Sequence, residues 1–391
     1  MMNKMNVPLL DLKLQYQSLK SEIEPVLMRV AESQALILGE EVVKLEKSIA
    51  EYCDCKYAIG VSSGTDALLA ALMALEIGAG DEVILPDYSF FATAGVVARL
   101  NAKPVFVDSE PESFNINPSL IEKYINKNTK AIIPVHLYGQ VAAMNEILEI
   151  ANNHGIPVIE DCAQSIGAQY FDGRKCGSIG LMGCFSFYPT KNLGGFGDGG
   201  IITTNDEKLA TKLRQMRNHG MEPKYYHSFI GGNFRLDAIQ AAVLNIKLPH
   251  LEDWHEARRR NGELYTKLFI EKGLSSEAGF QSFDDENKVL IPKAIYQESG
   301  VKNYHIYNQY CPRIQKRDEL RQFLSENNIG SEIYYPVPFH NQPCFAKFSG
   351  DGSEFPVSNA LSSQMIALPI FPELTADQIS YVVDVISEFF K

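Results

Sequence analysis

Between residues 56 and 204 the chain alternates short apolar segments with helical ones, and this alternation restricts the possible folds more than any other feature. The segments with strand character lie at 56–61, 82–85, 104–107, 131–135, 158–159, 185–187 and 201–203. Most are apolar along their whole length, as expected of parallel strands that are covered on both faces. Helical segments fall between them at 67–75, 91–100 and 143–154. The pattern predicts an α/β fold with a mostly parallel sheet flanked by helices.

The pattern changes near residue 250. A polar, Arg-rich helix is expected at 254–269, a less regular stretch follows, and a last helix is expected at 376–389. At 391 residues the chain is too long for one simple core. We therefore expect a large domain at 1–250 and a smaller α+β domain at 251–391. Ahead of the first strand, 19–52 is expected to be helical because its apolar residues recur at helical spacing.

Charge and composition exclude several classes of partner. The formal net charge is −12 and the pI is about 5.2, which disfavours binding to nucleic acid or to anionic membranes. No apolar run reaches the roughly 20 residues of a membrane helix, and no signal segment is recognisable, so a cytoplasmic location is expected. The seven cysteines are expected to be reduced. Cys53 and Cys55 have no second Cys/His pair at metal-site spacing, so no metal is expected.

Ligands bind outside the carboxyl ends of the strands in open α/β sheets, so residues that follow the predicted strands are candidates for a site. The first is the turn at 62–65, which leads into an almost wholly apolar helix. Free N–H groups and the positive end of the helix dipole attract anions there. Gly64 allows close approach of the backbone, and Thr65 adds a hydroxyl group. Taken alone, the turn is better explained as an ordinary helix cap.

Asp161 directly follows another buried strand. A carboxylate in such a place needs a cation or strong hydrogen-bond donors, and a protonated pyridine nitrogen would meet that need. Gln164 lies three residues further along and is expected to face the same site. The competing interpretation of Asp161 is a helix N-cap at the end of the strand.

Lys191 stands between an apolar strand and a loop dense in glycine. A partly desolvated lysine amine has a lowered pKa and becomes a nucleophile that forms Schiff bases. Ser186, a few residues upstream, has a hydroxyl group suited to a phosphate. A fourth segment, 231–235, brings Asn233 and Arg235 to the start of a helix, where they can reach an anion. The alternative for Lys191 is an exposed surface lysine, the usual environment of this residue.

These four sites and three further stretches, in this order, resemble the DegT/StrS family of sugar aminotransferases, which belong to the fold-type I enzymes dependent on pyridoxal 5'-phosphate (PLP). The matching stretches are SGTDAL at 63–68, PDYSF at 86–90, VHLYGQ at 135–140, EDCAQS at 160–165, FSFYPTKN at 185–192, GNFRL at 232–236 and YPVPFH at 335–340. The resemblance covers roughly residues 7 to 385. It implies the fold-type I architecture, with PLP as the cofactor.

The resemblance also implies roles for single residues. Lys191 matches the lysine that forms the Schiff base with PLP, and Asp161 matches the partner of the pyridine nitrogen. Phe90 matches an aromatic residue that stacks on the ring, and Gln164 a residue near the ring and its phenolic oxygen.

Three further residues match the phosphate site, namely Gly64, Thr65 and Ser186. Asn233 matches a residue that reaches the phosphate from the neighbouring subunit, which implies a homodimer with shared active sites. The substrate residues implied are Tyr335 and His340 in the last stretch, and His305 in the run 303–310.

The activity implied is transfer of an amino group from L-glutamate to a nucleotide-linked 3- or 4-oxo sugar, giving an amino sugar for cell-surface polysaccharide or lipopolysaccharide. Relatives that dehydrate sugars have histidine in place of the lysine, so Lys191 favours transamination. Two alternatives stay open. One is an acceptor without a nucleotide, such as 8-oxo-3,8-dideoxy-octulosonate, and the other is a non-catalytic regulatory protein on the same fold. A dehydrogenase is disfavoured because no G-x-G-x-x-G follows the first strand.

Overall fold

The computed structural model describes residues 4–276, 283, 288–349 and 352–391. Its central layer is built from two hydrogen-bonded sheets, ordered β1-β7-β6-β5 and β3-β2-β4. The strands are β1 (Tyr57–Val61), β2 (Glu82–Pro86), β3 (Lys103–Val107), β4 (Thr129–Ile132), β5 (Ile159–Asp161), β6 (Met182–Ser186) and β7 (Gly200–Thr204). Parallel bridges from Ile132 to Val158 and from Val135 to Asp161 join the two sheets between β4 and β5.

The predicted, mostly parallel arrangement is confirmed. The β2–β3, β2–β4 and β5–β6 pairs are parallel, and β7 alone among these strands runs antiparallel to its neighbours β1 and β6. The boundaries differ by a few residues from the expected ones. β4 ends at Ile132 rather than at residue 135 because Pro134 has no N–H group with which to continue the ladder.

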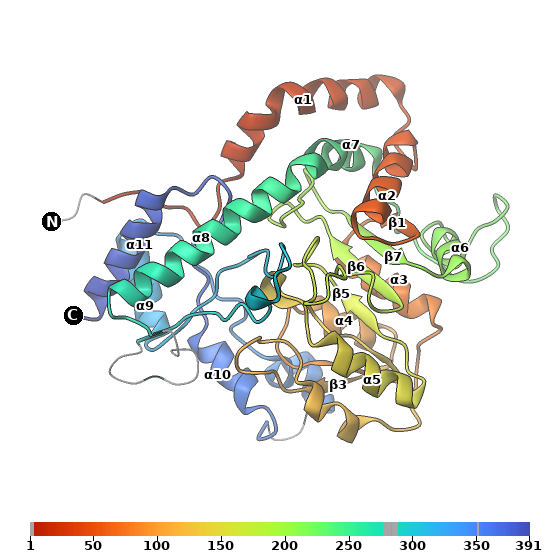
Figure 1. Ribbon diagram of the computed structural model, residues 1–391. Coiled ribbons are helices and arrows are strands. Elements are labelled where there is room, and N and C mark those ends of the chain that lie inside the picture. Colours follow the sequence, from red (N-terminus) through yellow and green to blue (C-terminus); the bar gives the residue numbers. More distant parts are fainter. Residues whose placement is uncertain (1–3, 277–282, 284–287, 350–351) are drawn as a thin grey trace.

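Helices cover both faces of the sheet (Figure 1). In the first part of the chain they are α1 (Leu12–Ser33), α2 (Glu40–Tyr52), α3 (Gly64–Ala74), α4 (Ala92–Arg99), α5 (Met144–His154), α6 (Glu207–Met216) and α7 (Ala238–Lys247). Along β2, Ile84 packs in the hydrophobic cluster that contains α2, α5 and α7. Its neighbours Val83 and Leu85 pack in the cluster that contains α3, α4 and α6. Burial on both faces explains why the strands are apolar throughout.

The helical segment expected at 19–52 is two helices. α1 ends at Ser33, and Gln34 adopts a left-handed conformation with φ 52°. α2 begins after Gly39, where a Cβ atom would lie 2.8 Å from the carbonyl oxygen of Ala35. The chain therefore turns sharply between the helices, which spacing alone did not reveal.

The C-terminal part gathers around one long helix, α8 (Leu251–Glu271), which extends from beside α7 to the C-terminal helices (Figure 1). The other elements are α9 (Arg317–Glu326), α10 (Pro356–Gln364), α11 (Ala376–Phe389) and the antiparallel pair β8 (Val289–Leu290) and β9 (Arg313–Ile314). Tyr265 and Phe269 of α8 pack with α9 and α11 in a separate hydrophobic cluster. Val7 joins this cluster, so it is not made only by residues after 250. The domain limits 1–250 and 251–391 stay a prediction.

Across the described residues, no helix combines the length and the apolar character needed to cross a membrane.

Candidate active site

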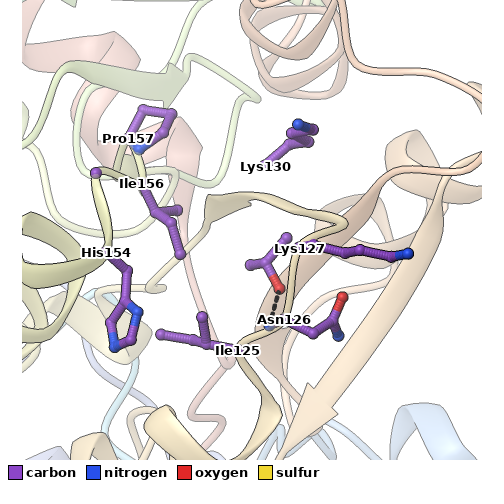
Figure 2. A pocket seen from close by; sticks show the side chains of 9 residues that line it. Ile125, Asn126, Lys127, Lys130, His154, Ile156 and Pro157 are labelled. Carbon is purple, nitrogen blue, oxygen red and sulfur yellow. Dashed lines mark hydrogen bonds between the residues drawn. The ribbon is translucent and has the colours of Figure 1, made fainter.

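Two cavities of similar size lie within the described residues, and one of the two is lined by predicted site residues. The first, of about 500 Å³, lies beside Ile125 and Ile156. Figure 2 shows Lys127 extending away from these apolar side chains, and the ring of His154 beside Ile125. His154 pairs with Glu122 across 3.3 Å. This cavity offers no nucleophile with a buried acidic partner.

The second cavity, of about 450 Å³, lies where β5 and β6 end and α3 begins. The predicted residues that line it are Gly64, Thr65, Phe90, Asp161, Gln164, Ser186, Lys191 and Tyr335. We call it the active-site cavity. Residues distant in sequence meet here because parallel strands bring their carboxyl ends to one edge of the sheet.

The start of α3 gives this cavity an anion-binding corner. The Ser63 hydroxyl caps the helix by accepting from the N–H of Asp66 at 3.0 Å. In the described chain no acceptor is found for the N–H groups of Gly64 and Thr65, which stand at the positive end of the helix dipole. A Cβ atom on residue 64 would lie 2.7 Å from Cβ of Ser186, so glycine is what lets the Ser186 hydroxyl come close. Two N–H groups and the hydroxyls of Thr65 and Ser186 suit a phosphate group.

Asp161 is a buried carboxylate at the end of β5. Its Oδ2 accepts from the hydroxyl of Thr93 at 2.8 Å, and its Oδ1 accepts from the N–H of Ala163 at 3.1 Å. Burial raises the pKa of Asp161, and these two hydrogen bonds and the charge of Lys191 oppose that rise. Within the described ranges it forms no ion pair. A cationic ring nitrogen would complete its environment, so the site fits a pyridinium group.

Lys191 supplies the amine of the cavity. Burial lowers the pKa of Lys191 from 10.5 to about 8, although the Asp161 carboxylate acts in the opposite direction. A larger share of neutral amine is therefore present near pH 8 than for an exposed lysine. The next residue, Asn192, donates to the carbonyl of Ile306 at 3.0 Å and so ties the lysine loop to the C-terminal part.

An aromatic ring and an amide complete the wall. Phe90 is 55% exposed and lines the cavity, so one face of its ring is available to a ligand. Its ring centroid lies 5.9 Å from that of Tyr335. Gln164 accepts from the N–H of Tyr138 at 2.6 Å through Oε1, and it donates through Nε2 to the Tyr335 hydroxyl at 3.0 Å.

The structure does not bring two predicted substrate residues to this cavity. His340 is buried against Asp87, with 2.6 Å between Nδ1 and Oδ2, and its ring stacks on Phe355. His305 accepts from the N–H of Tyr307 at 3.0 Å and stacks on the same residue. Both imidazoles are thus engaged inside the protein.

Asn233 also lies away from the cavity of its own chain, on the exposed surface. Residues that sequence reasoning missed include Tyr188, Thr190, Gln309 and Tyr334, all of which line the cavity. Tyr188 and Thr190 lie within three residues before Lys191, and this closeness was a signal that could have found them. Gln309 belongs to the run 303–310 that was expected near the sugar, but nothing in the run distinguished it.

A second acidic group follows Ile159 but serves a different purpose. Glu160, His136 and Cys162 place three potential metal ligands within 4.8 Å of one another. Glu160 already accepts from the N–H groups of Gly177, Ile179 and Gly180. His136 Nδ1 accepts from the N–H of Ala142, so Nε2 carries the proton that is donated to Glu160 at 2.9 Å. These hydrogen bonds engage both carboxylate oxygens of Glu160 and both ring nitrogens of His136, and they hold the turn at 177–180 against β5.

Known proteins share this architecture over nearly the whole chain. The family model of the DegT/DnrJ/EryC1/StrS aminotransferase family matches residues 17–387. The chain is 48% identical over 387 residues, 99% of each sequence, to the "Pleiotropic regulatory protein" of Geobacillus stearothermophilus.

Two other relatives are named for amino transfer to UDP-linked sugars. The chain is 40% identical to UDP-N-acetyl-3-dehydro-alpha-D-glucosamine 3-aminotransferase of Acidithiobacillus ferrooxidans, over 97% of each sequence. It is also 40% identical to UDP-2-acetamido-2-deoxy-3-oxo-D-glucuronate aminotransferase of Pseudomonas aeruginosa, over 96% of this chain and 98% of that one.

Two solved structures have the same overall fold as this chain. DesV of S. venezuelae, in complex with a ketimine intermediate, has a TM-score of 0.88 at 38% identity and covers 98% of both chains. NtdA of Bacillus subtilis, with the bound cofactor PMP, has a TM-score of 0.86 at 27% identity over 99% of this chain and 86% of that one. The chain therefore belongs to the DegT/DnrJ/EryC1/StrS aminotransferase family and is a fold-type I transaminase that uses the PLP/PMP cofactor.

Proposed function

We propose that this chain transfers the amino group of L-glutamate to the oxo carbon, C3 or C4, of a nucleotide-linked sugar, and that the product is an amino sugar for cell-surface polysaccharide or lipopolysaccharide. The observation that carries the proposal is the placement of an amine of lowered pKa, Lys191, and a buried carboxylate, Asp161, in one cavity with an anion-binding corner. The names of the two 40% identical relatives support a UDP-linked 3-oxo sugar in particular.

The residues that would hold the cofactor follow from the geometry of the cavity. The N–H groups at the start of α3, with the hydroxyls of Thr65 and Ser186, would bind the phosphate. Phe90 would cover one face of the ring, and Asp161 would accept from the protonated ring nitrogen. PLP, when bound, supplies an electron sink that makes the C–H bond of the amino-bearing carbon acidic. Asp161 keeps that sink effective because its negative charge holds the nitrogen proton in place.

Lys191 has two roles in this proposal. Its amine attaches the cofactor covalently in the resting enzyme. Once displaced by the amino donor, Nζ acts as the general base that takes the proton from the α-carbon of L-glutamate. In the second half of the reaction, Nζ returns a proton to the sugar carbon that becomes the amino-bearing carbon. The lowered pKa suits both steps, because a group with a pKa of about 8 accepts and donates protons near neutral pH.

A homodimer with shared active sites is part of the proposal. Asn233 is exposed and does not line its own cavity. In a symmetric dimer it is free to reach the phosphate corner of the neighbouring subunit. Exposed apolar residues near it, Tyr225, Tyr226 and Ile230, are 77%, 70% and 89% exposed and would be covered by such contact.

A second candidate function is regulation, and the specific observation in its favour is the name of the 48% identical relative. Regulation does not require a buried lysine beside a buried carboxylate. The nucleotide-free acceptor also stays open, because a cavity volume of about 450 Å³ does not distinguish a free sugar from a nucleotide-linked one.

The experiment is a spectroscopic half-reaction. PLP-loaded protein mixed with L-glutamate alone should lose its visible absorbance as the pyridoxamine form appears, and the right oxo-sugar should restore it. Lys191→Ala should abolish the change, whereas Lys130→Ala, an exposed lysine at the other cavity, should leave it intact. Loaded protein that shows no change with L-glutamate, or with any other amino donor, would contradict the proposal.

A further inference from the structure

The active-site cavity has a small extension that the proposed mechanism does not use. A hollow of about 40 Å³ adjoins it, and Thr190, Gln309 and Tyr334 line both. The far wall of the hollow includes Arg258 of α8. A water molecule takes up ~30 Å³ in the liquid, so the extension has room for one small group but not for a sugar or a nucleotide.

Gln309 presents an unpaired amide at the entrance of this hollow. Its Oε1 is buried without a hydrogen-bond partner. No acceptor is found for its Nε2 either, within the ranges that the structure describes. Buried polar groups nearly always have partners, and an orphaned one is costly. Because neither end is engaged, the amide can turn its N–H group or its oxygen toward a ligand.

Arg258 provides positive charge behind the hollow. Its Nη1 donates to the carbonyls of Tyr307 and Ile370 at 3.0 and 2.9 Å, but its buried Nε has no partner. No carboxylate of the described chain pairs with this guanidinium within 4.0 Å. Burial lowers the pKa of Arg258 to about 10, and the more distant Glu373 only partly opposes that effect. A buried cation without an anion at contact distance is costly, and a bound anion would remove that cost.

The segment that carries Gln309 is fixed relative to the reactive lysine. Asn308 donates to the side chain of Asn192 at 2.9 Å, and Asn192 donates to the carbonyl of Ile306 at 3.0 Å. Asn192 directly follows Lys191 in the chain. The backbone at Gln309 is therefore held at a set position relative to Lys191, and its side-chain amide starts from that position.

We propose that Gln309, with the charge of Arg258 behind it, binds a carboxylate of the amino donor. The inference rests on the proposed function, because it assigns the subsite to the amino acid of that reaction. An amino-acid donor always has a carboxylate beside its reacting carbon, whereas most sugars have none, and the small hollow admits a carboxylate end alone. The N–H group of Gln309 would donate to a carboxylate oxygen, and Arg258 would stabilise the charge through a dry environment.

The test measures binding of glutarate, a dicarboxylate without an amino group, to the PLP-loaded enzyme by titration calorimetry. Gln309→Met removes the amide at nearly constant volume. It should lower the affinity for glutarate at least ~10-fold, the effect of losing one hydrogen bond to a charged group. Gln309→Glu adds a like charge and should weaken it further. The matched control is Gln342→Met, at a partly buried glutamine outside the cavity that donates to the carbonyl of Val337. Gln309 carries the test because replacing Arg258 would also free two carbonyl groups and risk misfolding.

A second arm uses D-glucuronate, since a sugar carboxylate is the other source of the same chemistry. A lower affinity of Gln309→Met for glutarate, together with an unchanged affinity for D-glucuronate, supports the proposal. An unchanged affinity of Gln309→Met for glutarate, or a loss of affinity for D-glucuronate alone, overturns it. Wild-type enzyme that accepts no amino group from L-glutamate would defeat the proposed function itself. Wild-type enzyme that accepts the amino group, beside a Gln309→Met variant with unaltered glutarate affinity, would overturn only this inference.

Discussion

The amide of Gln164 donates to the hydroxyl of Tyr335 across 3.0 Å and so links the end of β5 to a loop of the C-terminal part. The orientation of the amide is set, because its oxygen accepts from the backbone N–H of Tyr138. Tyr335 is held a second time, by its own N–H, which donates to the Tyr88 hydroxyl at 2.7 Å. Since the Tyr335 oxygen already accepts a hydrogen bond, its hydroxyl proton is left to point toward the cavity.

Tyr335→Phe should therefore impair activity without disturbing the cofactor. The ring stays beside Phe90, but the cavity loses one directed donor and Gln164 loses its acceptor. We expect kcat/KM to fall about 10-fold, the effect of one hydrogen bond to a ligand. The visible spectrum of the loaded enzyme should be unchanged. Steady-state kinetics and the absorbance of the loaded protein provide the check.

The control for this substitution is Tyr16→Phe, at a partly exposed tyrosine outside the cavity whose hydroxyl donates to Glu24. Both variants lose one phenolic oxygen, so a general effect of the substitution would appear in both. Kinetics of Tyr335→Phe that match those of Tyr16→Phe would show that the directed donor has no role.

The lowered pKa of Lys191 predicts how cofactor capture depends on pH. Below a pKa of about 8 the amine is an ammonium ion and cannot attack an aldehyde, and above it the amine is neutral. The rate at which apoprotein binds PLP covalently should rise with pH, with a midpoint near 8, and level off above it. Stopped-flow absorbance with borohydride trapping measures this rate. A midpoint near 10.5 would mean that burial does not act on Lys191 in solution.

Asp161→Asn gives the matching comparison, because the Asp161 carboxylate acts to raise the pKa of Lys191. Removing that charge should move the midpoint of capture to lower pH. An upward shift would contradict the assigned sign of the interaction.

Much of the fold, and the gathering of most candidate site residues in one cavity, could be predicted from the sequence because their signals are local. A parallel strand covered on both faces must be apolar throughout, and its carboxyl end must open onto the site. Asp161 and Ser186 both lie where a strand ends, so finding the strands also located these residues. The break between α1 and α2 depends on the conformations of Gln34 and Gly39, which the spacing of apolar residues does not encode.

The residues contributed by the C-terminal part were less predictable. Gln309 and Tyr334 line the cavity from two separate loops of the C-terminal part, and no periodic pattern marks them. His340 lies elsewhere than the resemblance implied. Its place in the resembling stretch implied contact with the substrate, but a buried carboxylate that sequence reasoning did not pair with it, Asp87, holds the imidazole inside the protein.

His340→Ala should therefore reduce stability more than it alters substrate affinity. The side chain of Asp87 would lose the imidazole at its Oδ2 atom while remaining buried. Breaking one partner of a buried pair costs about 3 kcal/mol or more of unfolding free energy. Denaturant unfolding measures this cost, with His154→Ala as the control, since that histidine is paired with Glu122 at the surface. Unchanged stability together with a raised KM for the sugar would show that His340 takes part in substrate binding instead.

The shared active site can be tested by mixing two inactive variants. Lys191→Ala lacks the amine, and Asn233→Asp would place a negative charge against the phosphate of the neighbouring subunit. In a symmetric dimer, a mixed pair contains one site built from Lys191 of one subunit and Asn233 of the other. Random reassociation of equal amounts should restore about a quarter of wild-type activity. If each site were complete within one subunit, mixing would restore nothing, because no combination of the two chains places both residues in the same site.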